Sequence, residues 1–388
     1  MNNPTNNKRA LPHIVIATAY FYPKIGGVEN YSYMLAKKLQ ESGEYTVSII
    51  TSDYDNTKNA KLIIDGMTVY RLPVGFRLSN TPMNLRWYWE IKKILKQEKP
   101  DILHVHSPVP YLPDMAAWAG KNVPMVFTYH SGSMKKGKWP IDALIQIYEK
   151  VFLAKMFQRA RAVIAISQEF VKNTFPQYKN KTFFIPTGVD LGRFKKMPLP
   201  ASQRVTYVGR IEHSSSWKGI DSLLQAMTIV VSQCPEATLE LIGGGDALPH
   251  YKERAAQLGI AESVVFSGPK RGAELVEAYS RSNVVVLSSI SDSEAFSVTL
   301  VEAMACGRPI VGTNIGGTPQ LIDHEKNGLL VAPNKPEELA AAIIRVLNDT
   351  TLAQNLAASG AERSIGFSWD IQAKKYSDIF QSMLTKNI

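Results

Sequence analysis

The stretch SEAFSVTLVEAMACGRP, residues 293–309, decides the fold prediction. Its first residues are typical of a loop, and Ser297 is a suitable N-cap for a helix over 298–306. Gly307 and Pro309 are expected to end this helix, because glycine adopts the left-handed cap conformation and proline cannot continue a helix. Such a loop and helix fit the open end of a parallel sheet.

Two glutamates lie in this stretch at positions suited to a ligand. Glu294 precedes the predicted helix and Glu302 lies within it. The free N–H groups at a helix N-terminus suit a phosphate, and the carboxylates could accept hydrogen bonds from sugar or ribose hydroxyls. Two solvated glutamates, one in a loop and one on a helix surface, account for the same pattern equally well.

Strand-like and helix-like segments alternate outward from this stretch along the whole chain. In the second half, strands are predicted at 204–208, 238–242, 264–267, 284–288, 310–313 and 328–331, with a helix near 219–232. In the first half, strands are predicted at 13–19, 47–51, 102–106, 125–129 and 163–166, with a helix near 28–41. A Pro-containing stretch at 195–200 resembles a linker. The pattern predicts two doubly wound α/β domains that face each other across a cleft.

Composition excludes several classes of protein. The 388 residues suggest two domains, and no apolar run approaches the ~20 residues that cross a bilayer. Only Cys234 and Cys306 are present, so neither a disulfide framework nor a cysteine-ligated metal site is expected. Residues 1–9 are polar and unlike a secretory signal, which points to the cytosol.

Charge is divided unevenly between the two halves. Residues 1–200 carry 28 Lys+Arg and 14 Asp+Glu, a net of +14, whereas residues 201–388 carry 16 and 20, a net of −4. The first half is therefore expected to meet something anionic, such as nucleic acid, a membrane surface or a phosphorylated metabolite.

Several motifs together resemble the retaining glycosyltransferases of family 4, which have the GT-B fold. The Glu-x7-Glu pattern of Glu294 and Glu302, followed by Ala-Met-Ala-x-Gly-x-Pro-Ile-Val, carries the resemblance. Further motifs occur in the family's order: Val208-Gly209-Arg210 with Lys218-Gly219, Gly243-Gly244-Gly245, Val265 to Gly268, Gly316-Gly317, and in the first half Pro23 to Glu29, Pro100 to His106, Tyr129-His130 and Ile185 to Asp190.

The resemblance implies a role for each matching residue of the second half. Arg210 and Lys218 would hold the pyrophosphate of a nucleotide-sugar donor, and their charges would stabilise the leaving group. Glu294 would contact the donor sugar and Glu302 the ribose hydroxyls. The backbone N–H groups of the residues between them would contact sugar and phosphate; these residues are Phe296, Ser297, Val298 and Thr299. Ser297 stands where the family usually has glycine.

In the first half, Gly26 and Gly27 would bring backbone close to the phosphates from the opposite domain, although a structural tight turn explains them as well. His130 would lie near the reactive carbon of the transferred sugar. His104 and His106 alternate along a predicted strand, but no carboxylate or cysteine stands near them, so no metal site is expected.

The resemblance also implies the domain plan and the reaction. Residues 10–195 would form an acceptor-binding Rossmann-like domain, 201–365 a nucleotide-sugar-binding domain, and 366–388 a helix that crosses back onto the first domain. Transfer of a hexose with retention, without metal or cofactor, is expected. The donor would be of the GDP-mannose or UDP-glucose/GlcNAc type, and the acceptor lipid-linked or a saccharide in cell-envelope glycan or glycolipid synthesis.

Three alternatives stay open. One is a GT-B nucleotide-sugar epimerase or phosphorylase, and another is an inactive module that binds a membrane or polyanion. The third concerns the basic and aromatic clusters of the first half, Arg86 to Lys96 and Lys135 to Trp139. Either these are ordinary solvated helix faces, or they hold the protein peripherally on the inner face of the cell membrane. Nucleic-acid binding is not expected, because no module for it appears.

Overall fold

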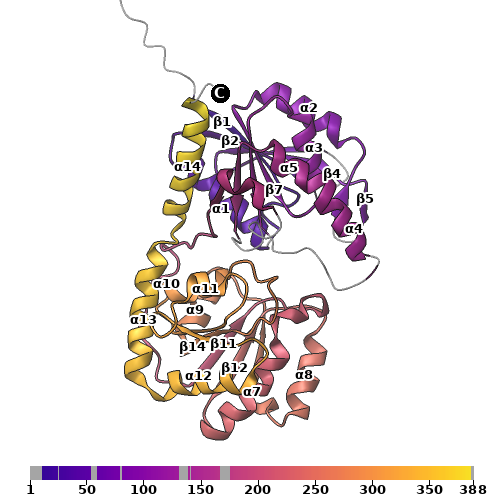
Figure 1. The fold of residues 1–388 in the computed structure, drawn as a ribbon. Helices are drawn as coiled ribbons and strands as arrows, with labels where there is room; N and C mark the ends of the chain where they lie inside the picture. The colour runs from indigo at the N-terminus through magenta and orange to yellow at the C-terminus, as the bar shows by residue number, and fades with distance from the viewer. Residues whose placement is uncertain are drawn as a thin grey trace, which may run out of the picture.

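The computed structural model describes residues 11–24, 26–53, 59–78, 81–130, 139, 141–166 and 175–385. Within these residues the chain forms two parallel α/β sheets, one above the other in Figure 1. We call the parts built on them the N-terminal and the C-terminal domain. Both follow the doubly wound pattern, so the predicted fold class is confirmed.

The N-terminal sheet has the strand order β10-β9-β8-β7-β1-β2-β4-β3, and β3 alone pairs antiparallel. Its strands are β1 (His13–Ala17), β2 (Thr46–Asp53), β3 (Ala60–Ile64), β4 (Met67–Pro73), β7 (Ile102–Ser107), β8 (Met125–Tyr129), β9 (Ala162–Ala165) and β10 (Thr182–Phe184). A separate hairpin consists of β5 (Phe76–Leu78) and β6 (Thr81–Met83). The helices are α1 (Gly27–Glu41), α2 (Trp87–Glu98), α3 (Leu112–Ala119), α4 (Ile141–Tyr148) and α5 (Ala154–Arg159), with a π-helical turn at Glu149–Leu153 before α5 and a 3₁₀ turn at Pro176–Lys181.

The C-terminal sheet has the order β13-β12-β11-β14-β15-β16. Its strands are β11 (Arg204–Val208), β12 (Thr238–Ile242), β13 (Val264–Gly268), β14 (Val284–Leu287), β15 (Ile310–Thr313) and β16 (Leu329–Val331). The helices are α7 (Ile220–Gln233), α8 (Leu248–Gln257), α9 (Gly272–Ser280), α10 (Val298–Ala305), α11 (Thr318–Leu321), α12 (Pro336–Asn348), α13 (Thr350–Ile365) and α14 (Trp369–Thr385), with 3₁₀ turns at His213–Lys218 and Ala261–Ser263.

The stretch that decided the fold prediction forms α10 as expected. Ser297 caps the helix, since its Oγ accepts a hydrogen bond from the Leu300 N–H at 3.3 Å, and Gly307 adopts φ +68° just beyond its end. Arg308 is fully buried and donates to the carbonyl oxygens of Met197 and Pro198. The same stretch therefore also fastens the interdomain segment to the C-terminal domain.

The last helix, α14, leaves the C-terminal domain and packs on the N-terminal one. In Figure 1, α13 lies along the lower domain and α14 runs up beside α1 of the upper one. Lys38 of α1 and Asp370 of α14 form an ion pair at 2.9 Å, and Tyr376 and Phe380 are fully buried with residues of α1 and β1. Among the helices described here, none is both long and apolar enough to cross a bilayer.

Candidate functional site

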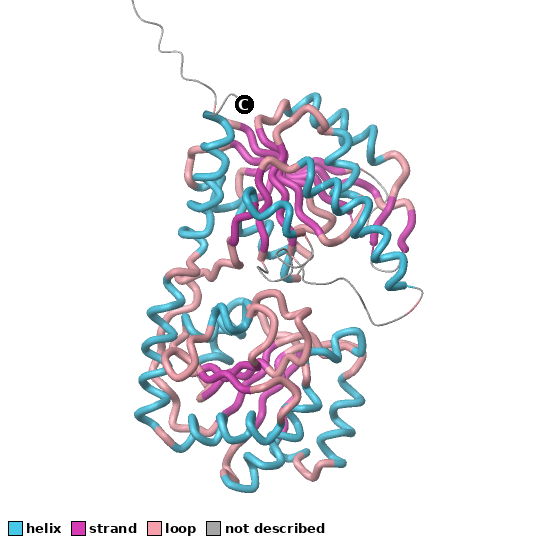
Figure 2. Tube along the Cα trace, viewed as in Figure 1, coloured by secondary structure: helices cyan, strands magenta, loops and turns pink. Residues whose placement is uncertain are grey.

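Loops at the carboxyl ends of the C-terminal strands face the N-terminal domain, as the pink segments of Figure 2 show. The strand order reverses direction between β11 and β14, so the crevice between the loops after these strands is where doubly wound sheets bind ligands. The loop after β11 carries Arg210 and Lys218, and the segment after β14 carries Glu294 and leads into α10. The predicted donor residues thus gather at this edge.

Lys218 and Glu294 form a nearly buried ion pair in this crevice. The Lys218 Nζ lies 2.6 Å from the Glu294 Oε2, and the two side chains are only 16% and 6% exposed. Ser289, just after β14, donates to the same oxygen at 2.7 Å. Removing either charge would leave the other one poorly solvated, so the pair is strongly interdependent. Sequence reasoning assigned the two residues to different parts of a donor and missed their mutual contact.

Backbone packing fixes both partners of this pair. Gly219 has φ +69°, and a Cβ there would collide with the Ser288 carbonyl, which lies on the segment leading to Glu294. The Ser288 Oγ donates to the Lys218 carbonyl at 2.9 Å. Only glycine permits this close approach of the two loops.

A second glycine turn holds the Glu294 backbone from the other side. Gly316 has φ +56°, and a Cβ on Gly316 or Gly317 would collide with the carbonyl of Glu294 or Ala295 respectively. The Gly317 N–H donates to the Glu294 carbonyl at 2.8 Å. The loop before α10 is therefore clamped between glycine turns of two other loops.

The N-terminus of α10 lies directly after this clamped loop. Phe296 and Ser297 are buried, and Val298 and Thr299 are half-buried. The Thr299 Oγ1 donates to the Val208 carbonyl at 3.3 Å, which ties the helix start to the end of β11. The cap at Ser297 already uses the N–H of Leu300, so a ligand must meet the N–H groups before it.

Glu302, on the next turns of α10, is half-buried and accepts a hydrogen bond from the Tyr279 hydroxyl at 3.0 Å. Burial raises its pKa to about 7, although the Tyr279 hydrogen bond and the positive charge of Arg193 act in the opposite direction. This carboxyl group therefore changes its charge near neutral pH. Tyr279 carried no signal in the sequence.

Arg210 differs from Lys218 because its guanidinium is exposed. Its side chain is 63% exposed and lies 3.6 Å from the Glu212 carboxylate. Its charge also acts on Glu29 of the N-terminal domain, where burial raises the pKa and the charges of Lys24 and Arg210 lower it. Arg210 is therefore close enough to the start of α1 for its charge to act on Glu29.

The start of α1 is shaped around that glutamate. Gly26 is the N-cap in an extended conformation, and a Cβ on it would collide with the Glu29 carboxylate, whereas a Cβ on Gly27 would meet nothing within 4 Å. A carboxylate thus lies at the N-terminus of α1, where the helix dipole favours negative charge. The atoms that a Cβ on Gly26 would meet are the far end of the flexible Glu29 side chain, so a small displacement of that side chain would accommodate it.

Comparison with known proteins decides the family. The model of glycosyl transferases group 1 matches residues 193–363, and that of glycosyltransferase family 4 matches residues 25–193. Together they span both domains. The chain belongs to glycosyltransferase family 4.

Some relatives of this glycosyltransferase match it over nearly its full length. An uncharacterized glycosyltransferase of Methanocaldococcus jannaschii is 28% identical, covering 95% of this chain and 97% of the relative. Phosphatidyl-myo-inositol mannosyltransferase of Mycolicibacterium smegmatis is 24% identical, covering 94% and 92%.

Solved structures confirm the GT-B fold. Sucrose-phosphate synthase of Thermosynechococcus elongatus superposes with a TM-score of 0.80 at 24% identity, covering 96% of this chain and 99% of that one. Anabaena HepE in complex with UDP and glucose gives a TM-score of 0.71 at 21% identity, covering 96% and 100%.

In the N-terminal domain of this glycosyltransferase, His130 follows β8 and is half-buried. Its Nε2 lies 2.8 Å from the Nδ1 of His106, and the two rings stack at 5.0 Å. Burial lowers the pKa of His106 to about 3 and holds that of His130 well below its usual value. The histidine nearest the predicted transfer point is therefore neutral at physiological pH.

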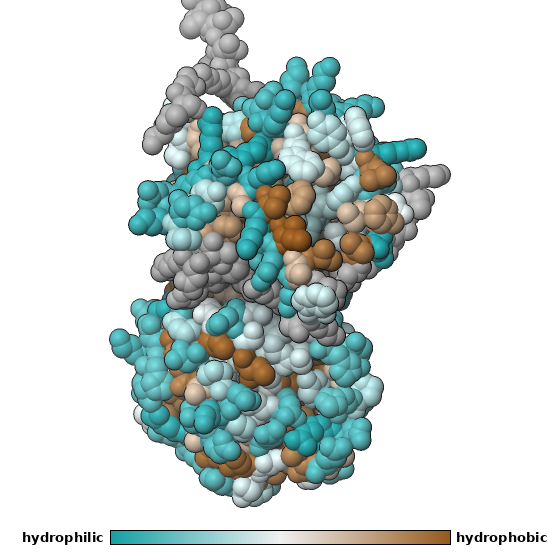
Figure 3. All heavy atoms as spheres, turned by 45° about the vertical axis from the view of Figure 1, so that its right-hand side comes forward, coloured by the Kyte–Doolittle hydropathy of each residue, from teal (hydrophilic) through white to brown (hydrophobic). Residues whose placement is uncertain are grey.

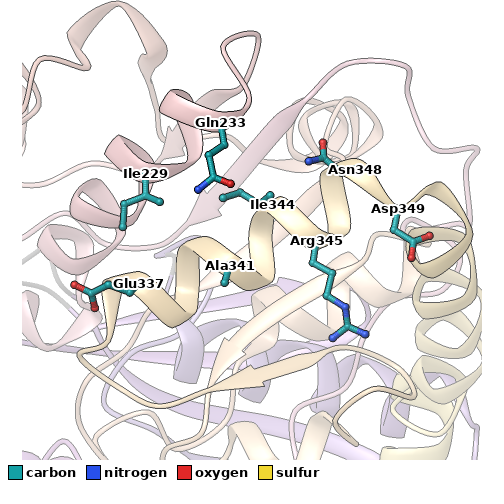
Figure 4. A pocket seen from close by; sticks show the side chains of 8 residues that line it. All are labelled: Ile229, Gln233, Glu337, Ala341, Ile344, Arg345, Asn348 and Asp349. Carbon is teal, nitrogen blue, oxygen red and sulfur yellow. The ribbon is translucent and has the colours of Figure 1, made fainter.

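No group of three or more His, Cys, Asp or Glu side chains placed to hold a metal ion occurs in the described part of the chain. A groove between α7 and α12 is lined by helix side chains that include Ile229, Glu337 and Arg345 (Figure 4). This groove lies away from the loops at the carboxyl ends of the strands, so it is not the candidate glycosyltransferase site.

Proposed function

We propose that the protein transfers a hexose, with retention of configuration, from a nucleoside-diphosphate sugar of the GDP-mannose or UDP-glucose/GlcNAc type to a lipid-linked or saccharide acceptor. The reaction would serve cell-envelope glycan or glycolipid synthesis. The observation that carries this proposal is the nearly buried pair of Lys218 and Glu294 at 2.6 Å, beside the N-terminus of α10. It offers a cation for phosphate and an anion for hydroxyl groups within one crevice.

In the proposed reaction the bond between the anomeric carbon and the phosphate oxygen breaks, and its electron pair stays on that oxygen. Lys218 and Arg210 stabilise the charge that develops on the leaving nucleoside diphosphate. The acceptor hydroxyl attacks the same face of the sugar and gives its proton to the departing phosphate oxygen. No protein base, metal or cofactor is needed for these steps.

The remaining residues bind and orient the donor. Glu294 accepts hydrogen bonds from the sugar hydroxyls, and Glu302 accepts them from the ribose. The N–H groups from Phe296 to Thr299 meet sugar and phosphate, as sequence analysis predicts. Gly26 and Gly27 bring the start of α1 to the phosphates from the other domain, and His130 lies by the reactive carbon.

Relatives support the substrate class. The mycobacterial relative is named a phosphatidyl-myo-inositol mannosyltransferase, and others are named D-inositol 3-phosphate glycosyltransferase or O-antigen chain mannosyltransferase. The Anabaena neighbour was solved with UDP-glucose. These names favour a hexose donor and acceptors that are inositol-based or part of a glycan.

The test is release of nucleoside diphosphate from a panel of UDP-, GDP- and ADP-sugars with EDTA present. We expect slow release from one donor, acceleration by a lipid or glycan extract, and loss of release in Glu294→Ala and Arg210→Ala. Arg345→Ala is the matched control, because Arg345 also pairs with a carboxylate, that of Glu325, but lies in the groove far from the strand ends. Absence of both donor binding and release for every donor contradicts the proposal, and an isomerised sugar product favours an epimerase.

We further propose that the N-terminal domain lies peripherally on an anionic membrane surface at the inner face of the cell membrane. The clearest support is a row of exposed apolar side chains along α4 and the turn after it: Leu144, Ile147 and Val151 are 66%, 56% and 42% exposed. Trp139, just before α4, is 87% exposed, and Figure 3 shows a row of apolar side chains on this domain. Exposed apolar residues on a strongly basic half fit insertion among anionic headgroups.

Of the two basic clusters that could contact the membrane, the structure describes the first one fully and the second one only in part. In α2, Trp87, Ile91, Ile94 and Leu95 are buried, so the helix packs on its sheet as the alternative interpretation expected. Its Lys92, Lys93 and Lys96 remain exposed and available to lipid. Lys135, Lys136 and Lys138 of the second cluster lie outside the described residues, and only Trp139 of that cluster is described.

Sedimentation with lipid vesicles tests the membrane proposal independently of catalysis. The full chain is expected to bind vesicles containing phosphatidylglycerol more strongly than pure phosphatidylcholine vesicles. Leu144→Asp with Ile147→Asp should abolish this binding, whereas Ile365→Asp, at a 55% exposed apolar residue of the C-terminal domain, should not. Equal binding by all three proteins contradicts the assignment, and a loss of dimerisation in place of vesicle binding would assign the row to a second copy.

A further inference from the structure

A chain of hydrogen bonds runs through the buried interior behind the acceptor side of the cleft. The His104 Nε2 lies 2.7 Å from the Thr128 Oγ1, which lies 2.9 Å from the Tyr376 hydroxyl. The Tyr376 hydroxyl lies 2.9 Å from the Tyr31 hydroxyl, and Tyr31 donates to the Ile185 carbonyl at 3.1 Å. Tyr376 belongs to α14, so the C-terminal helix takes part in the core of the other domain.

The carbonyl at the end of this chain fixes its direction. Since the Tyr31 hydroxyl donates to the Ile185 oxygen, it must accept from Tyr376, and Tyr376 must accept from Thr128. Thr128 then accepts from the Nε2–H of His104. Every hydroxyl donates once and accepts once, so the chain has a single consistent arrangement and holds its members in place.

The pair of His106 and His130 has a single consistent arrangement as well. The His106 Nε2 is buried and has no hydrogen-bond partner within the described residues. A bare lone pair there costs less than a buried N–H without an acceptor, so His106 carries its proton on Nδ1 and donates it to the His130 Nε2. His130 then carries its own proton on Nδ1, which makes it a neutral hydrogen-bond donor.

The hydrogen-bond chain contacts the histidine pair through two rings. The Tyr31 ring lies edge-on to His130 at 4.7 Å and 80°. The His104 ring lies 4.2 Å from that of His106. Tyr376 holds Tyr31 directly and holds His104 through Thr128. One hydroxyl on α14 therefore supports both rings that pack against the pair.

We propose that Tyr376 of α14 is a positioning residue for His130, so that the helix crossing from the donor domain orients the histidine on the acceptor side. The neutral His130 would then present its Nδ1–H to an oxygen of the transferred sugar or the acceptor. The hydroxyl of Tyr376 takes no part in bond making. For its activity readout the proposal rests on the transferase function proposed above.

Tyr376→Phe tests the proposal against a closely matched control. Tyr45→Phe also removes a buried tyrosine hydroxyl that bonds to α14, since the Tyr45 hydroxyl lies 2.9 Å from the Ser377 Oγ, but no hydrogen bond joins it to the histidines in the described structure. We expect Tyr376→Phe to lower kcat about tenfold with donor KM unchanged. Tyr45→Phe should leave kcat unchanged. The two variants should lower the melting temperature by similar amounts, because each loses one buried tyrosine hydroxyl.

Imidazole ¹⁵N chemical shifts give a readout that does not depend on catalysis. Wild type should show one neutral Nδ1–H tautomer for His130, and Tyr376→Phe should show a mixture, whereas Tyr45→Phe should not. If Tyr376→Phe does not fold, Thr128→Val breaks the same chain at its neighbour. Equal kcat values for Tyr376→Phe and Tyr45→Phe, together with unchanged ¹⁵N shifts in both, would overturn the proposal. If the ¹⁵N shifts change as expected but the protein turns over no donor, only the transferase function would be overturned.

Discussion

The two sides of the cleft are built from different chemistry. On the proposed donor side, charged groups face each other: Lys218 pairs with Glu294 at 2.6 Å, and Arg210 with Glu212 at 3.6 Å. On the proposed acceptor side, burial lowers the pKa of His106 and of His130, which keeps both neutral. A leaving diphosphate needs fixed charge, whereas a sugar or an acceptor hydroxyl needs only oriented donors and acceptors. The difference supports the proposal that the C-terminal domain binds the donor and the N-terminal domain the acceptor.

The largest expected effect comes from breaking the donor-side ion pair. Lys218→Met should lower kcat about a thousandfold and should destabilise the fold by about 3 kcal/mol, because Glu294 is left buried and unpaired. The double variant Lys218→Met with Glu294→Gln should regain the stability but not the turnover. Urea unfolding and donor turnover measure the two effects. Full activity in the double variant would contradict the assignment.

A second prediction concerns the glycine turns that shape the donor side. Gly243 has φ +154°, and a Cβ on it would collide with the Gly209 carbonyl, so Gly243→Ala should cost about 3 kcal/mol of unfolding free energy. In its neighbour Gly244, a Cβ would lie 3.6 Å from Pro269, an ordinary contact. Gly244→Ala should therefore leave the melting temperature nearly unchanged. Equal melting temperatures for both variants would show that the turn relaxes.

A third prediction separates the two sides by pH. Burial raises the pKa of Glu302 to about 7, and its carboxylate would accept the proposed ribose hydrogen bonds more strongly than the protonated acid. Affinity for a nucleotide sugar should therefore be highest above pH 7 and should fall about tenfold between pH 8 and pH 6. The phosphates of the nucleotide sugar keep their charge in this range, so they do not contribute to the change. Glu302→Gln should bind more weakly and without this dependence. Calorimetric titration at each pH measures it, and a wild-type affinity that rises toward pH 6 would contradict the role.

The smallest effect is expected at the exposed pair of the donor side. Glu212→Ala frees the Arg210 guanidinium, whose side chain is 63% exposed, for the donor phosphates. Because exposed ion pairs contribute only about 0–1 kcal/mol, the melting temperature should hardly change and donor affinity should rise about twofold. Donor affinity that drops in this variant would indicate that Glu212 itself binds the donor.

The comparison also explains what the sequence could predict. The cap at Ser297, the stop at Gly307 and the alternation of strands and helices are local, so the two-domain fold and α10 followed from short stretches. The contact of Lys218 with Glu294 spans 76 residues, and that of Thr128 with Tyr376 spans 248. Neither contact leaves a local signal, because its two partners meet only when segments far apart in the sequence pack against each other.

Other groups at the site were missed for the same reason. Ser289 follows a strand as many loop serines do, and Tyr279 looks like one apolar position of α9. Their roles appear only when the loops after β14 and the start of α10 are in place. Glu29 lay within a motif that suggested the family but gave no hint that its carboxylate covers Gly26.

The most direct test of the separate roles proposed for the two sides is a calorimetric measurement of affinity for the nucleoside diphosphate that is released in the donor panel. The account predicts that Arg210→Ala and the double variant Lys218→Met with Glu294→Gln bind it at least about tenfold more weakly than wild type, whereas His130→Ala binds it with unchanged affinity. A loss of affinity in His130→Ala as large as that in Arg210→Ala would contradict the account.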